Sequence, residues 1–282
     1  MPISESANRG IQTFEAALEL SGTQSLGKPL YCGVDLGTAY IVTAVVQEDG
    51  TPAAGVVTRS RSSIRDGLVL DYVGAINILR RQIERLKACG LQVRRAAAGL
   101  PPGTMGRNAQ AFGNVVRAVG LDLTRLIDEP SAASLVLGID NGAVVDIGGG
   151  TTGISVICNG EVVHTADEPT GGTHLDLVLA GHYKIGVDEA ERLKTDPSRQ
   201  AEIFELVRPV FQKMAAIVRE NLAGHSLQTI YLVGGTSCFS GVEQVMREET
   251  GLEVLKPRNP LLVTPLGIAL SCAQPQPVET YL

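Results

Sequence analysis

The apolar positions in the first third of the chain fall into short runs separated by turn residues, which is the pattern of strands in a sheet. We expect strands over 30–36, 39–46, 53–58 and 93–100. Between the last two, apolar residues recur every three or four positions. A helix should therefore begin after Asp71, whose carboxylate can cap it, and end at Gly90. Two more helices are expected over 104–119 and 131–137, the second opened by Pro130.

The same order of elements returns in the second half of the chain. Strands are expected over 143–147, 153–158, 161–166 and 229–233, and helices over 175–183, 188–194, 201–223 and after Gly241. Asn159-Gly160 is typical of a two-residue hairpin turn between two of these strands. Pro209 should break or kink the long helix, because proline lacks the amide hydrogen that a helix needs.

Two turns, one in each half, share a sequence. In residues 33–38 and again in 145–151, a strand ends in Asp and an apolar residue, and Gly and Thr follow. An internal duplication explains this, and it predicts two α/β lobes around a cleft, each with a mixed sheet flanked by helices. We expect a flexible leader over residues 1–28, lobe I over 29–142 and lobe II over 143–259. A helix over 260–272 should return to the region between the lobes, and a loose tail should follow over 273–282.

The leader contains one apolar stripe. Ile11, Phe14 and Leu18 share a helical face. A helix of this length is marginal in water by itself, so it needs a surface on which to dock. We therefore expect a flexible segment, with a docked helix as the alternative.

Composition narrows the classes of function. The 282 residues are 44% hydrophobic and 19% charged with a net charge of −6, which suits a globular protein and argues against nucleic-acid binding. The apolar runs are too short for a membrane span, and no export signal is visible. Five cysteines without a Cys-x-x-Cys pair favour reduced thiols in the cytoplasm, and the four histidines lack the spacing of a metal site.

The repeated turns also suggest a chemistry. A glycine-rich turn between two strands points successive backbone N–H groups into one concavity, which suits phosphate oxygens. Thr38 and Thr151 add hydroxyl donors, and Asp35 and Asp146 can hold the water shell of Mg²⁺. Gly234-Gly235 follows a third strand in a similar way. The sequence contains no P-loop, dinucleotide-binding Rossmann turn or esterase serine motif.

These segments resemble the nucleotide motifs of the actin-like and DnaK-type ATPases, a fold shared with sugar kinases. The first phosphate motif corresponds to residues 33–39 and the second to 146–152. The adenosine motif corresponds to 232–237 and the connecting segment to 128–133. Residues 188–194 resemble the Glu-x-x-Lys helix of MreB-type filament proteins. The resemblance implies a two-lobed actin-like ATPase fold, with duplicated RNase H-like lobes around a nucleotide cleft. It also implies binding of ATP or ADP with Mg²⁺.

The same resemblance assigns roles to individual residues. Asp35, Glu129 and Asp146 would be catalytic, with Glu129 orienting water and the two aspartates holding Mg²⁺ through water. The implied nucleotide contacts are Gly37, Thr38, Ala39, Gly148, Gly149, Gly150, Thr151, Thr152, Glu191, Lys194, Gly234, Gly235 and Thr236.

Four further segments resemble the EutJ family of ethanolamine-utilisation proteins, at 65–72, 99–104, 166–172 and 264–269. This resemblance implies a cytoplasmic protein associated with a bacterial microcompartment. It would act as a chaperone-like or assembly factor on ethanolamine ammonia-lyase or on a shell protein. We expect no nucleic-acid or membrane partner, and the sequence is compatible with an oligomer.

The sequence departs from DnaK-type enzymes at two positions. Their catalytic lysine would lie between Gln47 and Leu100, where the only lysine is Lys87 on an expected helix, and Thr173 stands where relatives commonly carry an acidic residue. The loss of one stabilising group commonly costs about 10²–10³ in rate. We therefore expect ATP binding with slow hydrolysis, so that lobe closure rather than turnover carries the signal. The alternatives are a filament-forming actin-like scaffold, a small-molecule kinase or a scaffold without nucleotide.

Overall fold

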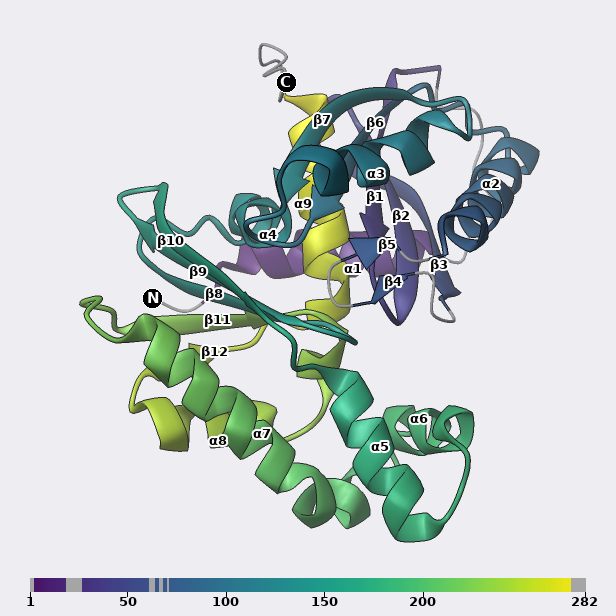
Figure 1. Cartoon of the computed structure of the whole chain (residues 1–282). Coiled ribbons are helices and arrows are strands. Elements are labelled where there is room, and N and C mark those ends of the chain that lie inside the picture. The colour runs from purple at the N-terminus through teal and green to yellow at the C-terminus, as the bar shows by residue number, and fades with distance from the viewer. Residues whose placement is uncertain (1–2, 19–26, 61–63, 66–67, 70, 275–282) are drawn as a thin grey trace.

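The computed structural model describes residues 3–18, 27–60, 64–65, 68–69 and 71–274. Two five-stranded sheets lie one above the other, each in its own lobe (Figure 1). Their strand orders are β3-β2-β1-β6-β7 in lobe I and β10-β9-β8-β11-β12 in lobe II, so they correspond strand for strand. In both sheets, neighbouring strands among the first three of this order are antiparallel. The fourth strand is parallel to the third, and the fifth is parallel to the fourth. The sheets therefore show the duplication that the repeated turns predict.

The strand bounds follow the apolar runs of the sequence. In lobe I they are β1 Leu30–Leu36, β2 Tyr40–Gln47, β3 Pro52–Arg59, β6 Arg95–Leu100 and β7 Asp122–Asp128, beside a short ribbon of β4 Ile64–Arg65 and β5 Leu68–Val69. In lobe II they are β8 Gly142–Ile147, β9 Thr152–Cys158, β10 Glu161–Glu168, β11 Thr229–Val233 and β12 Glu253–Leu255.

Helices cover the outer face of each sheet. Lobe I carries α2 Tyr72–Ala88 and α3 Gly106–Arg117, and lobe II carries α5 Gly172–Tyr183, α6 Val187–Thr195, α7 Gln200–Leu222 and α8 Val242–Thr250. The Asp71 side chain caps α2 by accepting from the Gly74 N–H at 2.8 Å, as predicted. None of the helices in the described part of the chain has the length and apolarity that a membrane span requires.

The two lobes exchange a helix. α4 Glu129–Leu137 follows the lobe I strands but contacts β8 and β9, whereas α9 Val263–Ala273 follows lobe II but packs on β1, β2 and β6. The two helices cross at Gly267, where a Cβ would overlap the carbonyl group of Ala132. Because each lobe is covered by a helix of the other half, the lobes share one apolar cluster at their junction.

The structure corrects three expectations about the elements. β7 and β12 were not expected, because their apolar pattern is weak; both are outer strands, and pairing with β6 and β11 stabilises them. Of the two effects expected of Pro209, the break is absent, because α7 continues through it to Leu222; the kink stays a prediction. The buried face of α7 contains Val207 and Phe211 and offsets the one missing hydrogen bond.

The expected flexible leader is wrong for residues 5–17. These form α1 Glu5–Ala17, with the Ser4 hydroxyl accepting from the Ala7 N–H at 3.1 Å, and the side chains of Ile11 and Phe14 are fully buried. The docked alternative holds because the stripe meets an apolar surface formed by β3, α4 and α9. Residues 1–2 and 19–26 of the leader, 66–67 and 70 of the family-like segment, and 275–282 of the tail lie outside the described residues.

Candidate functional site

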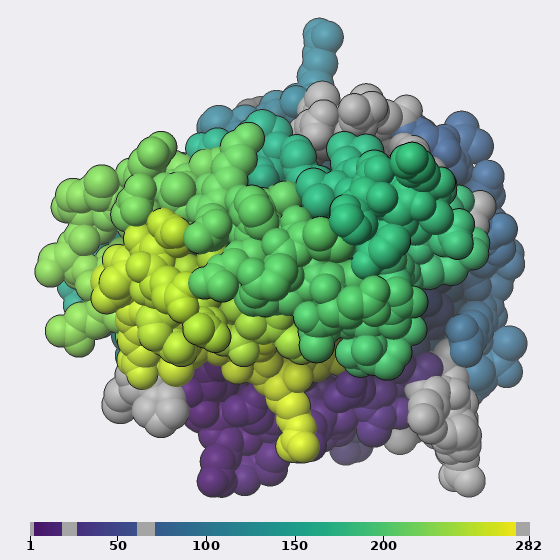
Figure 2. Space-filling view, turned by 90° about the horizontal axis from the view of Figure 1, so that it is seen from below, coloured from purple at the N-terminus to yellow at the C-terminus, as the bar shows by residue number. Residues whose placement is uncertain are grey.

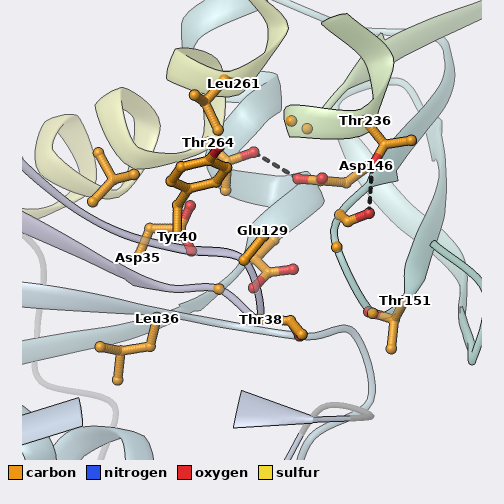
Figure 3. Close-up of a pocket in the computed structure, with 18 of the residues that line it drawn as sticks. Asp35, Leu36, Thr38, Tyr40, Glu129, Asp146, Thr151, Thr236, Leu261 and Thr264 are labelled. Atoms are coloured by element: carbon orange, nitrogen blue, oxygen red, sulfur yellow. Dashed lines mark hydrogen bonds between the residues drawn. The ribbon is translucent and has the colours of Figure 1, made fainter. Parts of the chain in front are cut away.

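A cleft between the lobes collects nearly all of the site residues that the sequence predicts (Figure 3). It is formed by the β1–β2 turn of lobe I, the β8–β9 turn of lobe II, the first residue of α4, part of α6 and the turn after β11. The predicted residues that line it are Asp35, Gly37, Thr38, Ala39, Glu129, Asp146, Gly148, Gly149, Gly150, Thr151, Glu191, Lys194, Gly234, Gly235 and Thr236. Thr152 is the exception, because its buried side chain donates to the Thr170 carbonyl at 2.7 Å.

The two glycine-rich turns face each other across this cleft. A Cβ on Gly149 would lie 2.8 Å from the Cβ of Ala39, and one on Gly150 would lie 2.8 Å from the Thr38 hydroxyl oxygen. Real Cβ contacts are longer, so side chains at these positions would push the turns apart. The glycines therefore allow backbone N–H groups from both lobes to serve one narrow space.

Neighbouring segments hold the lobe II turn in place. The Gly148 carbonyl accepts from the Thr236 hydroxyl at 2.7 Å and from the Gly172 N–H at 3.0 Å. The Gly149 carbonyl accepts from the Thr173 N–H at 2.8 Å. The Thr173 hydroxyl donates to the same carbonyl, so the side chain at this position, which the family resemblance led us to expect to be acidic, holds the backbone of the turn.

Three carboxyl groups face the cleft. Burial, aided by the charge of Asp146, raises the pKa of Asp35 to about 7. Burial raises the pKa of Asp146 to about 6, although a 2.7 Å hydrogen bond from the Thr264 hydroxyl acts in the opposite direction (Figure 3). Burial and the two aspartates raise the pKa of Glu129 well above its usual value. The three groups repel one another in a poorly solvated space, which a bound cation would relieve.

The residues present fit a magnesium ion held through water. In the described ranges, no three His, Cys, Asp or Glu side chains form a metal-ligand cluster. Mg²⁺ keeps several waters and takes one or two carboxylates together with phosphate oxygens. Asp35 and Asp146 supply oxygen donors of this kind from opposite lobes.

The two residues of the Glu-x-x-Lys helix that line the cleft are already paired. Glu191 of α6 forms an ion pair with Arg59 at the end of β3 in lobe I, and Asp188 lies 3.7 Å from the same guanidinium. Lys194 pairs with Asp176 at 2.8 Å and donates to the Gly172 carbonyl at 3.1 Å. Burial lowers the pKa of Lys194, and Asp176 opposes that shift.

Sequence reasoning missed several residues of the site. Arg59, Asp176 and Thr264 contact predicted residues from other elements, and Tyr40 and Leu261 line the cleft (Figure 3). Thr264 lies in the family-like segment 264–269, which could have drawn attention to it, whereas the other four lie outside the segments matched in the sequence. Lys87, the lysine considered for catalysis, lies exposed on α2, and the lysine among the residues that line the cleft is Lys194. Slow hydrolysis therefore stays a prediction.

Comparison with known proteins defines the family. The chain is 42% identical over 245 residues to the ethanolamine utilization protein EutJ of Escherichia coli K12, covering 86% of each chain. It superposes on the crystal structure of EutJ from Carboxydothermus hydrogenoformans with a TM-score of 0.88 at 48% identity, covering 94% of this chain and 97% of the other. The chain belongs to the EutJ family.

More distant matches place the EutJ family among actin-like proteins. The MreB/Mbl family model matches residues 50–202, and the model of cell division protein FtsA matches residues 143–271. MreB5 of Spiroplasma citri bound to AMPPNP has a TM-score of 0.69 at 17% identity, covering 85% of this chain and 94% of that one. This EutJ-family protein thus has the actin-like ATPase fold that the resemblance of its motifs implied.

Proposed function

We propose that this EutJ-family protein binds ATP with Mg²⁺ and acts in ethanolamine utilisation as a chaperone-like or assembly factor controlled by lobe closure. One observation carries the proposal: glycine-rich turns from both lobes face each other beside Asp35, Glu129 and Asp146. The distant relative MreB5 has been crystallised with AMPPNP and with ADP, which supports nucleotide binding by the shared fold.

In this proposal each lobe supplies half of a phosphate clamp. Backbone N–H groups of the two turns and the hydroxyls of Thr38 and Thr151 hold phosphate oxygens, and Asp35 and Asp146 hold the water shell of Mg²⁺. The ion would supply the charge that lowers the raised pKa values of these aspartates. Glu129 orients the attacking water once its proton has left. Contacts to both sides of one ligand favour the closed arrangement of the lobes.

The proposed client is ethanolamine ammonia-lyase or a microcompartment shell protein. The names of the E. coli and C. hydrogenoformans relatives support a role in ethanolamine utilisation. Nucleotide-dependent closure would change the surface presented to that client. Weak ATPase activity is enough for such a role, because binding and release set the conformational state.

A second candidate is a filament-forming scaffold, favoured by the MreB/Mbl match over residues 50–202. Sedimentation with and without ATP separates the two. A pellet that forms only with ATP and contains most of the protein supports the filament. A soluble monomer or small oligomer in both conditions supports the gated factor.

The deciding experiment is calorimetric titration of the full chain with ATP and Mg²⁺, followed by phosphate release from the same samples. We expect binding by the wild type, little release, and loss of binding in Asp146→Ala. Glu84→Ala, an exposed change on α2, is the matched control because it removes a carboxylate far from the cleft. Absence of ATP binding by a folded wild type would contradict the proposal.

A further inference from the structure

One stretch of lobe I carries a charge opposite to that of the whole chain. Residues 72–125 contain nine arginines and lysines but two carboxylates, Glu84 and Asp122, a net charge of +7 in a chain whose total is −6. They form α2, β6, α3 and the first half of β7, which lie in Figure 1 on the side of lobe I away from α5–α8. In Figure 2, seen from below, green residues of lobe II fill the front and blue residues of lobe I show at the rim. The excess of positive charge is therefore confined to one part of lobe I.

Five of the basic side chains lie where the helices of lobe I lead into its parallel strands. They come from the last turn of α2, the start of β6 and the last turn of α3, and all five are exposed: Arg85, Lys87, Arg94, Arg95 and Arg117. The two connections touch, since the Asp122 N–H at the start of β7 donates to the Arg94 carbonyl at 2.7 Å. We call these five residues the basic edge.

The basic edge lies at the end of the lobe I sheet that is far from the nucleotide cleft. β1, β6 and β7 are parallel, and the residues that line the cleft, Asp35, Pro101 and Glu129, lie at or just after the ends of these strands. The basic edge lies at the start of β6, about 20 Å away for a strand of six residues. A ligand bound to the basic edge would therefore leave the cleft open.

The positive charges of this region have no counter-charge within the protein. None of the nine basic side chains forms an ion pair with an acidic residue in the part of the chain that the structure describes. In lobe II, by contrast, Arg199, Arg208 and Arg219 each pair with a glutamate. Arg81 and Arg85 lie one turn apart on α2, and like charges at this spacing destabilise a helix. An anionic ligand would relieve this repulsion.

We propose that the basic edge binds an acidic segment of a partner protein, through pairs between its guanidinium groups and Asp or Glu carboxylates. Four of its five side chains are arginines. Arginine suits this ligand because the planar guanidinium donates two parallel hydrogen bonds to one carboxylate. The surface requires no nucleotide, so the inference goes beyond the proposed function and does not depend on it.

The surroundings of the basic edge favour a protein ligand over a nucleic acid or a membrane. The chain outside residues 72–125 is acidic, and it repels a long polyanion. The large apolar side chains exposed in this region, Tyr72, Val73 and Met105, lie at the beginnings of α2 and α3, whereas the basic edge lies at the ends of these helices. Among the described residues, the basic edge thus offers no aromatic side chain for base stacking and no apolar one for insertion into a bilayer.

The test uses the full chain and a fluorescein-labelled peptide of ten glutamates, with binding followed by anisotropy at 50 mM NaCl without nucleotide. The double variant Arg94→Gln/Arg117→Gln should bind about tenfold more weakly than the wild type, because two exposed charge pairs are lost. The matched control Arg192→Gln/Lys213→Gln removes two exposed charges from lobe II and should bind as the wild type does. Raising NaCl to 150 mM should weaken wild-type binding severalfold, because exposed pairs are screened.

Three results would overturn the proposal: no binding of the peptide by the folded wild type, an equal loss in both double variants, or tighter binding of a short DNA duplex or of phosphatidylglycerol vesicles than of the peptide. Self-association of the wild type that Arg94→Gln/Arg117→Gln abolishes would make a second copy the ligand and also contradict it.

Two further measurements keep the test decisive. If circular dichroism shows that Arg94→Gln/Arg117→Gln does not fold, Arg85→Gln/Lys87→Gln on the exposed side of α2 should show the same loss of peptide binding, and unchanged binding would overturn the proposal. The folded double variant should bind Mg–ATP as the wild type does, since the cleft lies at the other end of the sheet. Failure of ATP binding in the wild type leaves the peptide readout unchanged, so the two proposals fail separately.

Discussion

The repeated turns of the two lobes have similar sequences but different support. In lobe II, Thr236, Gly172 and Thr173 donate four hydrogen bonds to the carbonyls of Gly148 and Gly149. Among the described residues, the matching turn of lobe I is tied through the Ser60 N–H, which donates to the Ala39 carbonyl at 2.8 Å. Duplication thus kept the glycine-rich turn while its surroundings diverged.

The aspartates of the two turns differ in the same way. Asp146 accepts from Thr264 of α9, a helix that packs on lobe I, whereas the structure shows no such donor to Asp35 among the described side chains. A carboxylate held before the ligand arrives loses less entropy on binding. We infer that lobe II is the preorganised half of the site and lobe I the half that adjusts on closure.

The largest expected difference is between the two aspartates. Asp146→Ala should weaken Mg–ATP binding about 100-fold, whereas Asp35→Ala should weaken it about tenfold, because the preorganised carboxylate contributes more. Calorimetry on both variants, with the Glu84→Ala control, measures the gap. Equal losses would mean that the lobes contribute alike, and the comparison would fail.

The second effect is a pH dependence of about tenfold. With a pKa of about 7 for Asp35 and about 6 for Asp146, both groups are protonated at pH 5 and ionised at pH 8. Mg–ATP affinity should therefore rise from pH 5.5 to about 8 and level off above that pH. Asp35→Asn should remove the upper part of the rise, centred near pH 7, and an unchanged profile would refute the assignment.

Without ligand, the sign of the pH effect reverses. The folded protein binds these protons more tightly than the unfolded chain, whose aspartates titrate near 3.9. Stability of the free protein should thus be highest at low pH with respect to these groups, and it should fall as pH rises through 6 and 7. Thermal unfolding of wild type and Asp35→Asn at matched pH values isolates this contribution from the other titrating groups.

A third test loosens the lobe II turn. Thr236→Val removes one hydrogen bond to Gly148, worth about 1 kcal/mol, so ATP should bind about fivefold more weakly. Thr250→Val breaks a similar hydroxyl-to-carbonyl bond in α8 and should leave ATP binding unchanged. A tighter-binding Thr236→Val would show that the hydrogen bond restrains the turn in a non-binding shape.

The smallest effect concerns the ion pair between Arg59 and Glu191. Arg59→Ala breaks the ion pair between the lobes and frees Glu191, so nucleotide should dissociate about two- to threefold faster. Arg192→Ala, a neighbouring charge on α6, serves as the control. Stopped-flow displacement of a fluorescent nucleotide measures both rates. Slower release from Arg59→Ala would show that the pair competes with the nucleoside for Glu191.

Local patterns were enough to predict most of the fold. The glycine-rich turns, the Asp71 cap and the Asn159-Gly160 hairpin turn each depend on a few adjacent residues, and the positive φ angles of 52° and 78° at Asn159 and Gly160 agree with the predicted hairpin. The matching of two such turns predicted the two lobes, because a duplicated motif implies a duplicated sheet. The sequence by itself thus determined all but the outermost parallel strand of each sheet, and nearly all of the residues that face across the cleft.

Other features depended on contacts between distant segments. Whether α1 docks depends on the space beside Gly55, the pairing of Glu191 depends on Arg59 of the other lobe, and the support of Asp146 comes from Thr264. Even Thr152, inside a predicted motif, turns inward to the Thr170 carbonyl. Sequence patterns specify what one segment can do alone, whereas these contacts need the partner segment brought beside it. Which segments come to lie side by side is decided only by the packing of the two lobes around α4 and α9.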